Sequence, residues 1–166
     1  MLDICKQPSS TMAAAPDRDS RVVVCAIDGS AGDENVVEIA AQLAVLSKAK
    51  LALLAVAPVP PASAREWGLP TWTPAEAMRV LERTTVGLLG RVDVDYYLEA
   101  GNPVRRLVEF AARKRALLLV LGTRGSASSG PASIVANGVS RNAPCPVVVV
   151  PGGTAVPELH RFQTND

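Results

Sequence analysis

Short apolar runs at regular intervals, separated by stretches with helical spacing, constrain the fold of this chain more than any other feature of its sequence. Each run is four to six residues long and is followed by glycine, proline or polar residues. Runs of this kind are typical of strands that are covered on both faces, as in a parallel sheet. The runs are Val22–Ile27, Leu51–Val56, Leu117–Leu121 and Val147–Val150.

The segments between the runs predict helices. Asp33, Thr73 and Asn102 are expected to cap three of them, and Thr73 is followed by proline and then by Glu76 in a capping-box pattern. A fifth strand is predicted over residues 92–98, where apolar and polar residues alternate as they do in an edge strand with one wet face. Strand and helix thus alternate four times before a final strand. With right-handed crossovers, this order predicts an α/β fold with a doubly wound, five-stranded parallel sheet.

Length and composition fit one domain. We expect residues 1–20 to form a mobile leader, residues 21–151 the domain, and residues 152–166 a loose tail. The net charge of +1 gives no electrostatic reason to expect nucleic acid or a membrane surface as a partner. The three cysteines show neither metal-ligand spacing nor a disulfide framework, and no long apolar segment is present, so a reduced cytoplasm is the expected location.

Two predicted strands end in residues with unusual polar chemistry. Asp28, Gly29 and Ser30 follow the first strand, and a loop that starts with Gly122 and Gly125 follows the fourth. Ligands of open α/β sheets bind outside the carboxyl ends of the strands, where the strand order reverses. If these two strands are neighbours, Asp28 would meet a base or ribose and the glycine-rich loop would hold phosphates. The alternative is that Asp28 is a polar turn residue that ends a strand.

Five segments in this order resemble the universal stress protein family. Each one is short, but together they span residues 21–151. They are Val22–Ile27 with Asp28-Gly29-Ser30, Leu53–Val56, Gly101-Asn102-Pro103 with Leu107 and Ala111, Leu118–Leu121 with Gly122-Thr123-Arg124-Gly125, and Ala143-Pro144-Cys145-Pro146 with Val147–Val150.

The resemblance implies the strand order 3-2-1-4-5, a fold like that of the adenine nucleotide alpha hydrolases, and a homodimer formed through Val147–Val150. It also implies a role in the stress response, with ATP or another adenine nucleotide, together with Mg²⁺, bound between the first and fourth strands. Carried over by position, the residues implied to bind the nucleotide are Asp28, Gly29, Ser30, Val56, Gly122, Arg124, Gly125, Ser126 and Ser133.

The chain departs from the family in the second half of the phosphate motif. Family members that bind ATP have nine further residues after the second glycine, here Gly125, and then a glycine followed by serine or threonine. In this chain Val135 and Ala136 stand at those two positions. Alignment from the Ala-Pro-Cys-Pro segment puts Ser133 at the glycine position instead. Two alternatives therefore stay open: a stress-response protein that binds nucleotide, and a nucleotide-free dimeric interaction module with a degenerate ATP loop. His160, the single histidine, lies in the expected tail, so we predict no catalysis beyond slow ATP hydrolysis at best.

Overall fold

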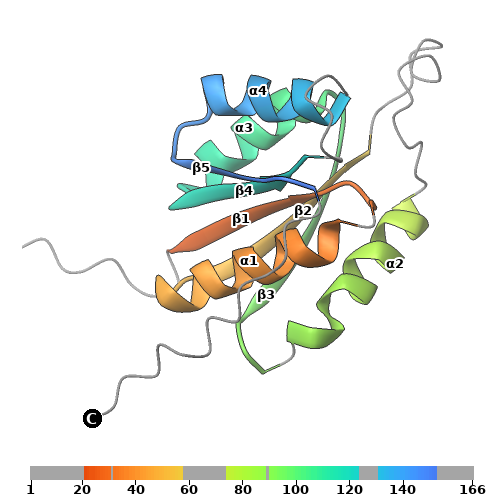
Figure 1. Ribbon diagram of the computed structural model, residues 1–166, viewed down its shortest axis with the longest axis vertical. Coiled ribbons are helices and arrows are strands. Elements are labelled where there is room, and N and C mark those ends of the chain that lie inside the picture. Colours follow the sequence, from red (N-terminus) through yellow and green to blue (C-terminus); the bar gives the residue numbers. More distant parts are fainter. Residues whose placement is uncertain (1–20, 31, 58–73, 89, 124–130, 153–166) are drawn as a thin grey trace, which may run out of the picture.

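The computed structural model describes residues 21–30, 32–57, 74–88, 90–123 and 131–152 of the chain. Strands and helices alternate along these residues (Figure 1). The elements are β1 (Val22–Ile27), α1 (Asp33–Leu46), β2 (Lys50–Ala57), α2 (Pro74–Thr85), the 3₁₀ helix η2 (Val86–Leu88), β3 (Val94–Ala100), α3 (Pro103–Lys114), β4 (Leu118–Gly122), α4 (Pro131–Asn142) and β5 (Val147–Val150). The predicted leader, and the predicted tail from residue 153 onward, lie outside the described residues.

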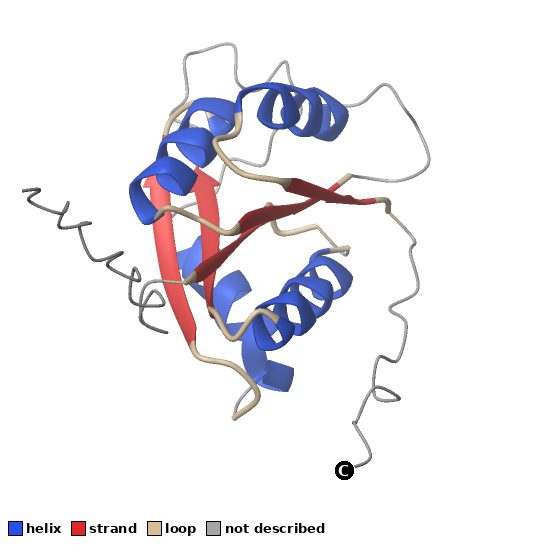
Figure 2. Cartoon of the chain, turned by 90° about the vertical axis from the view of Figure 1, so that its left-hand side faces the viewer, coloured by secondary structure: helices blue, strands red, loops and turns tan. Residues whose placement is uncertain are grey.

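The strands form one parallel sheet in the order β3-β2-β1-β4-β5, which confirms the predicted fold class. Residues 92–98 were expected to form the edge strand, and β3 does lie at an edge of the sheet, although it begins and ends two residues later. Helices α1 and α2 cover one face of the sheet, and α3 and α4 cover the other (Figure 1). Figure 2 shows the same three layers from the side.

The core is divided by the sheet, because successive residues of a strand point to opposite faces. Val23, Cys25 and Ile27 of β1 pack under α1 and α2, whereas Val24 packs under α3 and α4. Burial on both faces explains why the strands read as continuous apolar runs. Among the described residues, no helix is both long and apolar enough to span a bilayer.

Helix starts were predicted less accurately than strands. Asn102 caps α3 as expected, since its Oδ1 accepts the N–H of Arg105 at 3.1 Å. The prediction for Asp33 was wrong, because Gly32 is the N-cap residue of α1 and Asp33 is the first residue of the helix. Thr73, the predicted cap of α2, lies outside the described residues.

Candidate functional site at the carboxyl ends of β1 and β4

The two strand ends singled out by the sequence lie side by side. Strand β1 pairs with β4 in parallel, and the last paired residues are Ala26 and Leu121. Asp28 therefore follows β1 at the same edge of the sheet at which Gly122 ends β4. The β1–β4 pair is also the point where the strand order reverses, since β2 and β3 lie on one side of it and β5 on the other. This is the place where ligands of open α/β sheets bind.

The turn after β1 is held together by two carboxylates. Gly29 has a φ of +79°, a conformation that residues with a Cβ rarely adopt. The Oδ1 of Asp28 accepts the backbone N–H of Ser30 at 3.0 Å, which closes a local turn. The carboxylate of Asp33 reaches back from α1 and accepts the N–H groups of Asp28 at 3.2 Å and of Gly29 at 2.6 Å. Three of the turn's backbone donors, the N–H groups of Asp28, Gly29 and Ser30, are thus used within the protein.

Asp33, which the sequence predicted to cap its helix, instead holds the turn after β1. It is only 6% exposed, and its carboxylate faces the turn in front of α1. The pKa of the Cys25 thiol is raised well above its usual range, chiefly because Cys25 is buried and secondly because the charge of Asp33 is near. Cys25 and Cys145 are both free thiols, and burial also raises the pKa of Cys145.

Gly122 ends β4 where the sheet and α1 approach each other closely. A Cβ placed on Gly122 would lie 2.8 Å from Cγ2 of Val36, which is a buried residue of α1. The next residue, Thr123, donates its N–H to the carbonyl oxygen of Val150 at 2.9 Å, so this backbone group takes part in pairing with β5. Packing alone therefore accounts for a glycine at position 122, whether or not phosphate binds nearby.

The remaining predicted site residues are placed only in part. Val56 lies near the end of β2, is half-buried, and packs on the α3–α4 face of the sheet. The backbone of Ser133 belongs to the first turn of α4. Arg124, Gly125 and Ser126 lie outside the described residues, as does the side chain of Ser133. The structure thus brings Asp28, Gly122 and Val56 to neighbouring strand ends, and it does not test the phosphate half of the prediction.

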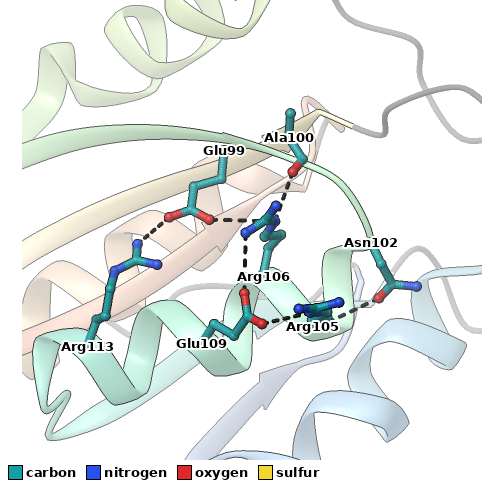
Figure 3. Close-up of polar contacts among 7 residues, drawn as sticks. All are labelled: Glu99, Ala100, Asn102, Arg105, Arg106, Glu109 and Arg113. Carbon is teal, nitrogen blue, oxygen red and sulfur yellow. Dashed lines mark hydrogen bonds and ion pairs between the residues drawn. The ribbon is translucent and has the colours of Figure 1, made fainter.

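A charged network at the turn between β3 and α3 was not predicted. Glu99 is paired with Arg113 and lies 4.0 Å from Nε of Arg106, and Glu109 accepts from Arg105 at 2.7 Å and from Arg106 at 3.3 Å (Figure 3). The neighbouring arginines, Arg105 above all, lower the pKa of Glu109. The i, i+4 spacing of Arg105 and Glu109 was the available sequence signal. The partners at Glu99 depend on the tertiary fold and had no such signal.

Two further observations concern ligands. Among the described residues, no group of three or more histidine, cysteine, aspartate or glutamate side chains is arranged to hold a metal ion. A cavity of about 210 Å³ lies between α1, α2 and η2, where Glu34, Glu38 and Arg83 contribute to its lining. Its volume is below the range of roughly 300–1,000 Å³ that is usual for pockets that enclose small molecules. The strand-end geometry is therefore the better guide to a site.

Comparisons with known proteins agree with this geometry. Residues 20–151 match the model of the Universal stress protein family. A solved universal stress protein in complex with cAMP is 26% identical, with a TM-score of 0.58 over 78% of this chain and 96% of that chain. Two structures from Archaeoglobus fulgidus are each 23% identical over 78% of this chain: a universal stress protein with a TM-score of 0.64 over 93% of its length, and one in complex with dAMP with a TM-score of 0.57 over 96%. No curated protein sequence matches the chain.

Proposed function

Because the chain belongs to the universal stress protein family, we propose that it is a stress-response protein that binds an adenine nucleotide at the adjoining ends of β1 and β4. The observation that carries the proposal is the parallel β1–β4 pairing, which brings the Asp28 turn beside Gly122 at the point where the strand order reverses. Similar structures contain cAMP and dAMP, which supports an adenine nucleotide as the class of ligand.

In this proposal the two ends of the nucleotide meet different chemistry. The carboxylate of Asp28 accepts a hydrogen bond from the base or the ribose, and Val56 contacts the adenosine. Gly29 and Ser30 complete that side of the site. The phosphates, with Mg²⁺, are held by the loop after β4, from Gly122 and by way of Arg124, Gly125 and Ser126 to Ser133 in α4. Cationic and hydroxyl side chains in that sequence, next to a helix start, are suited to bind an anion.

The proposal includes binding with little or no turnover. Asp28 is the one carboxylate expected to face the nucleotide, and no lysine follows Gly122–Gly125 in the sequence. A single carboxylate can orient a water molecule or a magnesium ion, but rapid phosphoryl transfer also depends on several cationic groups around the transferred phosphate.

The second candidate function is a nucleotide-free, dimeric interaction module of the same fold. The observation that favours it is the missing glycine after the loop, where Val135 and Ala136 or, in the other alignment, Ser133 and Ile134 stand. A Cβ at a position where the backbone approaches a phosphate would narrow the site. The two functions differ in whether nucleotide binds at all.

Thermal and chemical unfolding with and without nucleotide separates the two functions. A ligand present at 100 times its Kd adds about 2.7 kcal/mol to the free energy of unfolding. We expect millimolar Mg-ATP, AMP or cAMP to raise the unfolding midpoint of the protein and to raise that of the Asp28→Ala variant less. Glu82→Ala, at an exposed position of α2, is the matched control for loss of one carboxylate. An unchanged midpoint with every adenine nucleotide tested would favour the interaction module.

We also propose that the protein forms a homodimer through β5. This strand lies at an edge of the sheet, and it consists of four valines, of which Val149 is 38% exposed. An apolar edge strand is a ready partner for another strand. Light scattering should give twice the mass of 17.4 kDa for the chain and a monomer for Val149→Lys. Tyr96→Lys, on the opposite edge strand, should leave the dimer intact.

The proposed location is the cytoplasm. The free thiols of Cys25 and Cys145 support it, because reduced cysteines without a disulfide are usual in a reducing compartment. Fractionation of cells that express the tagged protein would test it, and recovery with the membrane or secreted fraction would contradict it.

A further inference from the structure

The buried carboxylate of Asp33 reaches back from α1 to the turn after β1. Asp33 is the first residue of α1 and follows the N-cap residue Gly32, which has no side chain to cap the helix. The carboxylate accepts the backbone N–H of Gly29 at 2.6 Å and that of Asp28 at 3.2 Å. A carboxylate that is 6% exposed is stable in the core only when such donors compensate for the water that it has lost.

These contacts fix the backbone from which the Asp28 side chain projects. Both N–H groups belong to the residues of the turn, and hydrogen bonds to an ionised acceptor are about twice as strong as neutral ones. The second carboxylate then closes the turn from within, since Oδ1 of Asp28 accepts the N–H of Ser30. The orientation of Asp28 beside the end of β4 is thus linked to Asp33 through two backbone groups.

We propose that Asp33 is a positioning residue for Asp28. This inference deepens the proposed function and rests on it, because the aligned Asp28 carboxylate is what the adenosine would meet. In this scheme Asp33 contacts the turn and not the nucleotide. It also determines what the turn can bind, since the N–H donors of Asp28 and Gly29 are already occupied by an anion. The turn therefore suits the hydrogen-bond donors of a base or ribose and disfavours a phosphate.

A double-mutant cycle on adenosine affinity tests the link. Asp33→Ala should weaken adenosine binding about tenfold, the effect of losing one charge-assisted hydrogen bond. Asp28→Ala should weaken it at least as much. If Asp33 acts through Asp28, the double variant should bind within about twofold of Asp28→Ala, because the interaction is already lost. Independent, multiplying losses of roughly a hundredfold would overturn the proposal.

Two further variants separate geometry from charge. Asp33→Asn keeps an acceptor oxygen for the N–H of Gly29 but removes the negative charge, so it should retain affinity within about threefold of the unchanged protein. Glu34→Ala removes the neighbouring, exposed carboxylate of the same helical turn and should leave affinity unchanged. Equal losses in Asp33→Asn and Asp33→Ala would show that the charge acts on the ligand directly, which contradicts a positioning role.

A readout without nucleotide keeps the inference distinct from the proposed function. The amide of Ser30 donates to Asp28 and not to Asp33, so its hydrogen exchange reports whether Asp28 has moved. Asp33→Ala should speed that exchange at least tenfold, while Asp33→Asn and Glu34→Ala should leave it near its original rate. Unchanged Ser30 exchange in a folded Asp33→Ala protein would refute the positioning role. Absence of adenosine binding by the unchanged protein would refute the proposed function alone.

Discussion

Gly122 is the first glycine of the phosphate motif and also lies against α1. Replacing it by alanine tests whether the packing against α1 alone requires a glycine there. The added Cβ would lie 2.8 Å from Cγ2 of Val36, closer than carbon atoms pack. Val36 is 3% exposed and β-branched, so it cannot rotate away without leaving its rotamer or shifting α1. Overpacking of this kind costs roughly 1–3 kcal/mol. Alanine also lowers the conformational entropy of the unfolded state relative to glycine, which offsets roughly 0.4–1 kcal/mol of the overpacking cost.

The expected net loss of stability is therefore about 1–2 kcal/mol, which lowers Tm by roughly 2–4 °C per kcal/mol for a chain of this size. Urea unfolding followed by far-UV circular dichroism measures it directly. The matched control is Gly87→Ala, because a Cβ at Gly87 meets nothing within 4 Å and the residue is exposed. That variant should stay within about 0.5 kcal/mol of the unchanged protein.

The decisive measurement is the double variant with Val36→Ala. Alone, Val36→Ala removes buried carbon and should cost roughly 1–3 kcal/mol. In the double variant, the methyl group added at position 122 occupies space that the valine has vacated. The loss of stability of the double variant should therefore be smaller than the sum of the two single losses by roughly 0.5–3 kcal/mol. Strictly additive losses, or a Gly122→Ala variant as stable as the Gly87→Ala control, would refute the packing explanation.

Three other predictions concern local features of the fold. Asn102→Ala should cost about 1 kcal/mol in urea unfolding because α3 loses its cap, whereas Asn102→Asp should not; equal losses would contradict the capping role. The pKa of Glu109 is lowered chiefly by Arg105, so this pair should stabilise the fold at pH values above the ordinary carboxyl pKa. The stabilisation should be lost as the pH falls through the lowered pKa. An NMR titration should show a higher pKa for Glu109 in Arg105→Ala. In a variant with Cys5 replaced by serine, a thiol reagent at pH 8 should modify Cys145 slowly and Cys25 only after unfolding, because burial raises the pKa of both thiols. Prompt reaction of Cys25 in the folded protein would refute this prediction.

The sheet was predictable because burial on both faces leaves a local signal. Each buried strand needs an apolar residue at nearly every position, so β1, β2, β4 and β5 appear in the sequence as uninterrupted runs. The edge strand β3 was displaced by two residues because Val92, which looks like a strand residue, instead packs against the core from the turn before the strand. The apolar runs do not predict which strands are neighbours, and the predicted strand order was implied by the resemblance to the universal stress protein family.

Side-chain partners at the site were harder to predict because several donors lie within reach of the same carboxylate. Asp33 stands where an N-cap is expected, and a helix start always offers N–H groups that lack partners. The turn in front of α1 offers N–H groups as well, and the positive φ of Gly29 folds them toward Asp33. No pattern in the sequence distinguishes these two sets of donors, since the choice depends on the path of the backbone between Ile27 and Asp33.

Gly122 shows why a motif residue and a packing residue can be the same residue. The glycine-rich sequence after β4 favoured phosphate binding, yet the approach of α1 to the sheet requires a residue without a Cβ at this position. The two demands have a common cause, because the strand end at which a ligand meets the backbone is also the place where the helix from the neighbouring strand begins. Retention of Gly122 is therefore weak evidence for nucleotide binding. Stronger evidence would come from residues such as Asp28, which is half-buried in the turn after β1 and belongs to neither cluster of the hydrophobic core.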